Sequence, residues 1–260
     1  MNRLSRDEFN ALLPLLRPAG RRESGLILVP GHKCAEEYLR AGGRPSLVLL
    51  DEERLPEARE TLGEAHWQEA LDRERLRRLR PHELARLADQ PSPEGLLLAG
   101  PPPAKGAEKR RAPHLLLDGV QDTGNLGAML RTALWFGLDR VWLLAPCADP
   151  WSPRGIRAGM GAIFHLAECR VLELEEFEAL LPGLRVRLLG LDASAECALD
   201  DFSFRDDDVL VLGSESHGLR LPEEWLAERL RIPGAGRAES LNVGHALAVC
   251  AWQRFRSRHA

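Results

Sequence analysis

An amide and a guanidinium follow the apolar run at 115–117. Asn125 lies in the turn with Gly127, and Arg131 comes six residues after the asparagine. An amide both donates and accepts hydrogen bonds, whereas a guanidinium carries a lasting positive charge and five N–H donors. This first polar segment, residues 115–137, therefore places two polar groups where open α/β folds have their ligand sites. Taken alone, it is also compatible with a plain strand–helix connection that carries a surface arginine.

A second polar segment, residues 209–219, also begins with an apolar run. The run ends at Gly213, and Glu215 stands two residues beyond it. Glycine lets the backbone approach a ligand closely, and Glu215 adds a carboxylate. Considered by itself, Glu215 is more typical of a solvated loop.

A third polar segment, residues 230–246, contains a Gly-rich loop after Ile232. Ser240, Leu241 and Asn242 then open the predicted C-terminal helix. Ser240 is open to two interpretations, a helix N-cap or a member of a site. Backbone N–H and C=O groups in this loop, and in the turn after Gly213, can hydrogen-bond the edge of a purine.

The elements that must position these segments alternate between short apolar runs and helical patterns. Downstream of residue 113, strands are predicted at 115–117, 141–144, 186–191, 209–212 and 230–232, and helices at 126–136, 175–181, 222–228 and 243–256. This alternation predicts a parallel α/β sheet covered on both faces, with the strands at 209–212 and 230–232 in its centre. Ligands bind at the carboxyl ends of such strands, so the three polar segments are expected at one edge.

A separate small α/β domain is predicted over residues 1–99. Its helices are expected at 6–16, 35–41, 64–72 and 81–88, and its strands at 26–29, 46–50 and 95–99. Residues 100–113 read GPPPAKGAEKRRAP and are predicted to form a linker, because consecutive prolines continue neither a helix nor a strand. Residues 114–260 form the second predicted domain.

Composition indicates a soluble globular protein. The 260 residues are 44% hydrophobic and 28% charged, the longest apolar runs fall short of a membrane span, and the N-terminus lacks the pattern of a signal peptide. A cytoplasmic protein without membrane contact is therefore expected. The five cysteines are scattered, which argues against a disulfide framework and a zinc site, so no metal is predicted.

The net charge of -4 does not by itself indicate a nucleic-acid binder. Positive charge is nevertheless clustered, with five arginines between residues 73 and 80 and a second basic run at 105–111. Arginine forks suit phosphate, but genome base composition produces the same bias. Both explanations stay open at this point.

The order and spacing of the polar segments over residues 114–256 resemble the SpoU/TrmH branch of the SPOUT RNA methyltransferases. The matching motifs are Asn-x-Gly-x-x-x-Arg at 125–131, Gly-x-Glu at 213–215, and Ile-Pro at 232–233 with Ser-Leu-Asn-Val at 240–243. The stretch RAGMGAIFH at 157–165 is similar to a further family segment. Upstream, residues 22–42 and 93–99 resemble the small ribosomal-protein-like domain that binds substrate in many of these enzymes.

The resemblance implies a mostly parallel α/β sheet with a C-terminal trefoil knot, a fold feature that is otherwise rare. It implies S-adenosylmethionine as cofactor, held largely through backbone groups of Gly213, Ile232 and Leu241. It also implies homodimers in which two subunits complete each site. The interface would use the helices at 126–136 and 243–256, where Trp135, Phe136, Trp252 and Phe255 serve either the interface or the core.

The implied reaction is methyl transfer to a ribose 2′-hydroxyl of RNA, with ribosomal RNA favoured over transfer RNA. Arg131 would hold a phosphate and stabilise the developing alkoxide, or act as the base, and Asn125 would orient Arg131 or the ribose. Glu215 would fix the first polar segment, and Ser240 and Asn242 would complete the site. Because guanidinium groups hold their proton tightly, the electrostatic role of Arg131 is preferred.

The sequence departs from the family pattern at Thr123, at Gly244 and across 216–218, and roles for His217 and His245 stay open. A hydrolase is disfavoured because residues 213–218 do not fit G-x-S-x-G. A dinucleotide-binding enzyme is disfavoured because no G-x-G-x-x-G follows the first strand. A catalytically inactive RNA-binding protein stays as an alternative.

Overall fold

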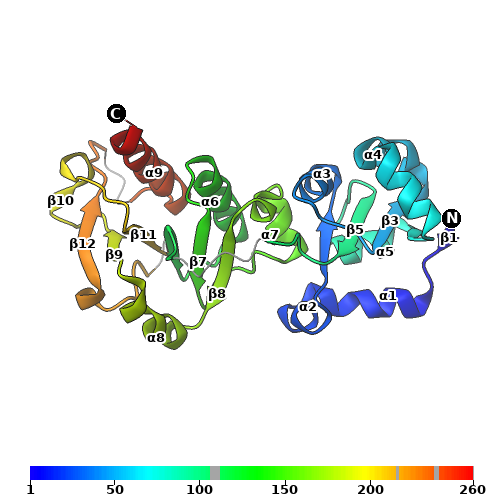
Figure 1. Ribbon diagram of the computed structural model, residues 1–260, viewed down its shortest axis with the longest axis horizontal. Coiled ribbons are helices and arrows are strands. Elements are labelled where there is room, and N and C mark those ends of the chain that lie inside the picture. The colour runs from blue at the N-terminus through cyan, green and yellow to red at the C-terminus, as the bar shows by residue number, and fades with distance from the viewer. Residues whose placement is uncertain (106–111, 215–216, 237–239, 260) are drawn as a thin grey trace. The chain divides into compact units, whose positions relative to one another are not determined.

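The computed structural model describes residues 1–105, 112–214, 217–236 and 240–259 (Figure 1). The predicted site residue Glu215 lies outside these ranges. The chain forms two compact units. The N-terminal unit comprises Met1–Gly106 and Asp149–His165, and the C-terminal unit comprises Ala107–Ala148 and Leu166–Ala260.

The N-terminal unit is built on a five-stranded mixed sheet. Its strand order is β1 (Asn2–Arg3), β4 (Leu76–Leu79), β3 (Leu47–Asp51), β5 (Leu96–Gly100) and β2 (Ile27–Pro30). Strand β5 is antiparallel to both of its neighbours, whereas β1, β4 and β3 are parallel. Its helices are α1 (Arg6–Leu12), α2 (Pro18–Ser24), α3 (His32–Arg40), α4 (Leu55–Asp72), α5 (Pro81–Ala88) and α7 (Pro153–Ala158).

Leucine side chains from the sheet and from helices α1 and α5 form one core of this unit. Helix α5 occupies the residues predicted for it, but strand β4 was not predicted. Its sequence LRRL buries the outer leucines and leaves Arg77 and Arg78 half-buried, so it lacks the β-branched pattern by which strands are recognised. Pairing with β3 and β1 fixes it as a strand.

The segment Asp149–His165 packs within the N-terminal unit, although the sequence analysis assigned it to the downstream domain. Phe164 is fully buried and meets the ring of Tyr38 edge-on at 5.4 Å between centroids. Ile156 is also fully buried, and its carbonyl accepts a contact from Cys34 Sγ at 3.7 Å. Apolar burial therefore ties this segment to helix α3.

Polar contacts reinforce the same packing. The Arg157 guanidinium donates to the carbonyl oxygens of Ala88 and Asp89 at 3.0 and 3.2 Å. His165 Nε2 lies 2.8 Å from a carboxylate oxygen of Glu37. Burial alone would raise the pKa of Glu37, but hydrogen bonds from Lys33, Arg40 and His165 outweigh it and lower that pKa to about 2.

The C-terminal unit contains a seven-stranded sheet in which all neighbouring strands are parallel. Its order is β10 (Cys197–Ala198), β12 (Leu226–Arg231), β9 (Arg187–Leu191), β11 (Asp208–Gly213), β6 (Leu115–Asp118), β7 (Arg140–Leu144) and β8 (Glu168–Leu172). The predicted parallel α/β fold is thus confirmed. Its central strands are buried on both faces, which explains the continuous apolar run of β6.

Helices cover this sheet on both sides. Helices α6 (Thr123–Trp135) and α9 (Val243–His259) lie side by side, as Figure 1 shows. Helix α8 (Leu174–Leu184) inserts Phe177 into a core formed with Leu116, Trp142, Val209 and Val211.

Two predictions about strand β12 are wrong. Residues 222–228 were predicted as a helix, but only the single turn Glu223–Trp225 is helical, and β12 begins at Leu226. Pairing with β9 outweighs the local helical pattern, as tertiary context commonly does. Strand β12 also lies beside the short edge strand β10 and not in the sheet centre, whereas β11 is central as predicted.

Removing the Phe164 ring should destabilise the N-terminal unit. We expect Phe164→Ala to lower the free energy of unfolding by about 3–5 kcal/mol, because it leaves a cavity against Tyr38. Met160→Ala, an exposed position in the same segment, should cost less than about 0.5 kcal/mol. Urea denaturation measures both. Equal effects of the two substitutions would show that the segment is not packed as described.

Candidate functional site at the ends of the parallel strands

The first and second polar segments leave the sheet from adjacent positions. Gly213, the last residue of β11, is the register partner of Asp118, the last residue of β6, and Asp118 is also the partner of Leu144 at the end of β7. Because these strands are parallel, their carboxyl ends share one edge. The first and second polar segments therefore start at the same edge of the sheet, as predicted.

A buried ion pair connects the loops at this edge. The Asp118 carboxylate is 1% exposed and accepts hydrogen bonds from Arg220 at its main-chain nitrogen (2.5 Å), Nε (2.8 Å) and Nη2 (2.5 Å). Arg220 Nη2 also donates to the carbonyl of Ala145 at 3.0 Å. One arginine thus joins the ends of β6 and β7 to the segment after β11.

The sequence analysis missed both members of this pair. A signal was nevertheless present, since Asp118 ends the otherwise apolar strand β6. A carboxylate buried in that position needs a cationic or hydrogen-bonding partner, and Arg220 directly follows the second polar segment.

Helix α6 starts earlier than predicted. The Asp122 side chain caps it by accepting a hydrogen bond from the Asn125 main-chain nitrogen at 2.7 Å. Asn125 and Gly127 therefore lie inside the helix and not in the turn before it, so their predicted placement is wrong. The cap was overlooked because the helical pattern of apolar residues begins only at Leu126.

Asn242 joins the third polar segment to the first. Its Nδ2 donates to Asn125 Oδ1 at 2.9 Å, across 117 positions of the chain. Its own Oδ1 accepts hydrogen bonds from the main-chain nitrogens of Gly244 at 2.9 Å and His245 at 3.4 Å. Asn242 is therefore the N-cap of α9, and the capping interpretation of Ser240 is wrong.

Arg131 lies on the exposed face of α6. Six residues separate it from Asn125, which places it about 9 Å further along the helix axis and about 120° around it. It shares this face with Ala128 and with Trp135, which is 83% exposed. Within the described part of the chain, no side chain forms a hydrogen bond or ion pair with the Arg131 guanidinium. The structure therefore shows no contact between the Arg131 guanidinium and Asn125.

Gly213 has a structural requirement of its own. The chain folds back through two hydrogen bonds between Ser214 and Gly218, of 3.1 and 2.9 Å. A Cβ on Gly213 would lie 2.0 Å from the Gly218 carbonyl oxygen. Only glycine therefore allows β11 to end in this tight turn, in which the exposed His217 donates its main-chain N–H to Ser214 Oγ at 3.2 Å.

The other two predicted cofactor residues flank the loop after β12. Ile232 directly follows this strand and is half-buried, while Leu241 is 50% exposed. Strand β9 separates β12 from β11, so the ends at Ile232 and Gly213 are about 10 Å apart at the usual strand spacing. Exposed glycines 234 and 236 present main-chain groups beside Ile232. This edge can hold an elongated ligand through backbone hydrogen bonds and apolar contacts.

Gly244, a departure from the family pattern, leaves room for the Asn242 side chain that caps α9. It is buried, and a Cβ there would lie 3.2 Å from Asn242 Oδ1 and 3.9 Å from both Ala128 and Met129. His245, next to it, is exposed. The glycine therefore keeps the cap of α9 free of side-chain crowding.

Thiol chemistry near this edge is disfavoured. Burial raises the pKa of Cys147 to about 11 and that of Cys250 to about 12. Both thiols stay protonated at neutral pH and are poor nucleophiles. The described residues also contain no group of three or more metal-ligating side chains, and none of their helices is long and apolar enough to cross a membrane.

The fold and site define a class, namely α/β proteins in which polar loops meet at the carboxyl ends of parallel strands. The SpoU rRNA methylase family model matches residues 112–252, more than half of the chain. The chain therefore belongs to the SpoU rRNA methylase family, as the sequence motifs predicted.

Relatives and a solved structure extend this result. A 23S rRNA (guanosine(2553)-2′-O)-methyltransferase of Bacillus subtilis is 29% identical over 240 residues, 88% of each chain. A tRNA/rRNA methyltransferase of Synechocystis, itself uncharacterised, is 30% identical over 186 residues. That alignment covers 68% of this chain and 66% of the relative, so the chain spans just under two thirds of the relative's length. The crystal structure of an RNA 2′-O ribose methyltransferase matches with a TM-score of 0.78 and 25% identity, covering 100% of both chains.

Replacing Asn242, the N-cap of α9, should destabilise the protein, whereas replacing Ser240 should not. We expect Asn242→Ala to lower the free energy of unfolding by about 1–2 kcal/mol, because the cap and the bond to Asn125 are both lost. Ser240→Ala should change it by less than about 0.5 kcal/mol. Chemical denaturation compares the two variants, and a larger loss for Ser240→Ala would contradict the assignment of the cap.

Proposed function

We propose that this protein transfers a methyl group from S-adenosylmethionine to a ribose 2′-hydroxyl of RNA, and that the RNA is ribosomal. The observation that carries the proposal is the hydrogen bond from Asn242 to Asn125, which joins two polar segments far apart in the chain. The register of Gly213 with Asp118 adds the third segment. The ribosomal substrate is supported by the family and by the rRNA methyltransferase relative from Bacillus subtilis.

The cofactor would lie across the ends of β11 and β12. Crystal structures of two proteins that share this fold carry AdoMet. When bound, the cofactor supplies a methyl group activated on a sulfonium. Backbone groups at Gly213 and Ile232 and the exposed Leu241 side chain fit an adenosyl group, because they combine hydrogen bonding with apolar surface.

Arg131 would act on the RNA. A ribose hydroxyl becomes a good nucleophile only as its proton is lost, and a guanidinium stabilises the negative charge that develops. The same fork can hold the adjacent phosphate. Since a guanidinium keeps its own proton, we assign Arg131 an electrostatic role and leave the proton to another acceptor.

For Asn125 we propose a positioning role. Its Oδ1 accepts from Asn242, and Arg131 lies on another face of α6, so Asn125 would position the start of α6 against α9. Ser240 is exposed two residues before the cap and stays a proposed member of the substrate site. Glu215 keeps its proposed role of fixing the first polar segment.

We also propose a homodimer through α6 and α9. The ring centroid of Phe136 lies 6.4 Å from that of Trp252 and 6.0 Å from that of Phe255, and the rings of Trp252 and Phe255 stack with their centroids 6.1 Å apart. Trp252 is exposed and Trp135 is almost fully exposed. An aromatic patch of this kind commonly marks an interface. Arg131 shares the face of Trp135, so a second copy seated there would lie beside the proposed catalytic arginine.

The rest of the proposal concerns organisation. Residues 1–99 would bind the RNA substrate, residues 114–260 would carry out the methyl transfer, and residues 100–113 would link these two domains. The protein would act in the cytoplasm. The trefoil knot stays a prediction, since part of the loop that would form it, residues 237–239, lies outside the described ranges. Transfer RNA and inactive RNA binding stay as alternatives.

Substitution of Arg131 tests the proposed reaction. We expect Arg131→Ala to lower the rate of methyl transfer to ribosomal RNA by about 100- to 1000-fold, the usual effect of removing one stabilising donor. Its affinity for S-adenosylmethionine, measured by calorimetry, should stay within about twofold, since the cofactor loops are elsewhere. Radiolabelled methyl transfer measures the rate.

Arg205→Ala serves as the matched control, because Arg205 is exposed in the same unit but outside the three polar segments. It should keep the rate of the unmodified protein. Full methyl transfer by Arg131→Ala would overturn the role of this arginine. The absence of transfer by the unmodified protein to any RNA would overturn the proposed function itself.

A further inference from the structure

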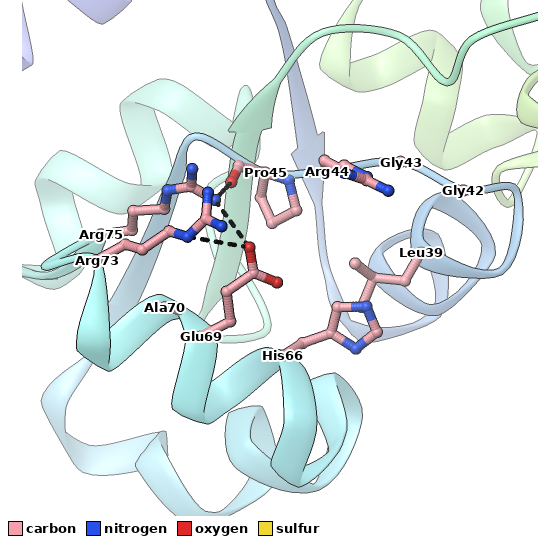
Figure 2. Close-up of a pocket in the computed structure, with 10 residues that line it drawn as sticks. All are labelled: Leu39, Gly42, Gly43, Arg44, Pro45, His66, Glu69, Ala70, Arg73 and Arg75. Carbon is pink, nitrogen blue, oxygen red and sulfur yellow. Dashed lines mark hydrogen bonds and ion pairs between the residues drawn. The ribbon is translucent and has the colours of Figure 1, made fainter.

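The N-terminal unit contains a hollow of about 490 Å³ that is distinct from the strand-end site. It lies where α3 and α4 end, between the loop that leads into β3 and the turn that leads into β4 (Figure 2). Its lining residues are Leu39, Gly42, Gly43, Arg44, Pro45, His66, Glu69, Ala70, Arg73 and Arg75. Its volume is in the range of sites for small ligands and single nucleotides, about 300–1,000 Å³.

Two arginines of this hollow are held together by one carboxylate. Glu69 Oε1 lies 3.3 Å from Arg73 Nε and 3.7 Å from Arg75 Nη1. Arg75 Nη1 also donates to the Pro45 carbonyl at 3.1 Å. Figure 2 shows both guanidinium groups gathered above Glu69, while His66 lies on the far side, facing Leu39. Each guanidinium has five N–H donors, so both keep donors for a ligand.

The charge of the lining is positive. The lining residues include three arginines and one glutamate, in a chain whose net charge is -4. Two further carboxylates, those of Asp72 at the end of α4 and of Glu74 in the turn before β4, are not among the lining residues, and Asp72 accepts a hydrogen bond from Gln68 at 2.9 Å. The lining residues themselves therefore carry an excess of positive charge, which favours an anionic ligand.

These arginines are not needed to cap the helices that end here. The main-chain nitrogens of Ala41, Gly42 and Gly43 already bond the last carbonyls of α3. The corresponding nitrogens of residues 73–75 bond the last carbonyls of α4. Because main-chain nitrogens already donate hydrogen bonds to these carbonyls at the helix ends, the arginines are not gathered here to serve as donors for them.

We propose that this hollow, the arginine pocket, binds one nucleotide of the RNA substrate. Arg44, Arg73 and Arg75 receive its phosphate, and the apolar floor of Leu39, Pro45 and Ala70 receives the sugar or base. Arginine forks match phosphate oxygens, and phosphate contacts fix the register of a protein on nucleic acid. The proposal rests on the proposed function, since it takes RNA as the ligand, and it gives a role to Arg73 and Arg75, two of the five arginines clustered between residues 73 and 80.

The test uses the full-length protein and a protein-free 23S rRNA transcript as probe. Arg44→Gln/Arg73→Gln removes two exposed donors and should weaken binding at physiological salt by about tenfold. A plot of log affinity against log salt concentration has a negative slope, and this slope should become shallower by about 1–2, as expected when one or two phosphate contacts are lost. For methyl transfer to the same transcript, KM should rise while kcat stays unchanged.

Two further variants make the result specific. Arg59→Gln is the matched control, because Arg59 is also exposed, lies on α4 and pairs with a carboxylate, that of Glu64, but does not line the pocket; it should bind RNA as the unmodified protein does. Glu69→Gln removes the single carboxylate and should tighten RNA binding and steepen the salt slope. A variant that merely damaged the fold would not bind more tightly.

The outcomes separate this proposal from the proposed function. Equal affinity and salt slope for Arg44→Gln/Arg73→Gln and the unmodified protein would overturn the arginine pocket while leaving methyl transfer in place. An equal loss of affinity in Arg59→Gln, or a loss in Glu69→Gln, would also overturn it. Pocket-dependent RNA binding without methyl transfer by the unmodified protein would support the pocket and overturn the proposed function.

Discussion

The ion pair between Asp118 and Arg220 is the constraint on which the strand-end site depends. The carboxylate is buried at the end of a central strand and would cost several kcal/mol if it were left without a partner. Arg220 satisfies it with main-chain and side-chain donors and adds a bond to Ala145. The loops after β6, β7 and β11 are thereby fixed relative to one another. Because the strand-end site is built from these loops, the ion pair between Asp118 and Arg220 helps to set its geometry.

The second organising contact is the pair of asparagines. Asn242 caps α9 and hydrogen-bonds Asn125 near the start of α6, so the N-terminal ends of the two helices are joined, and Gly244 leaves room for the Asn242 side chain. This arrangement turns Arg131 and Trp135 outward together. Within one subunit, no hydrogen bond or ion pair joins the proposed catalytic arginine to Asn125, and a second subunit of the proposed dimer would lie beside this arginine.

Residue patterns predicted much of this fold and less of its fine geometry. Parallel strands such as β6 and β11 are buried on both faces, so their continuous apolar runs are recognisable, and α5 carries a clear helical pattern. The first three residues of β12 were predicted as part of a helix, because only the pairing of this strand with β9 decides their conformation. The Asp118–Arg220 pair, the cap at Asn242 and the docking of residues 149–165 all join positions distant in the chain. The pattern of neighbouring residues contains no information about such long-range contacts. The family motifs did identify which segments of the chain are the polar ones.

The central claim is that the cofactor binds across the ends of β11 and β12. Hydrogen–deuterium exchange of the full-length protein, with and without saturating S-adenosylmethionine, tests it most directly. We predict that binding slows exchange in peptides covering residues 213–220 and 232–242, because a ligand held by backbone groups protects those amides. Exchange in peptides of the five-stranded sheet should be unchanged. Protection confined to other segments, or no protection at any concentration of S-adenosylmethionine, would contradict the account.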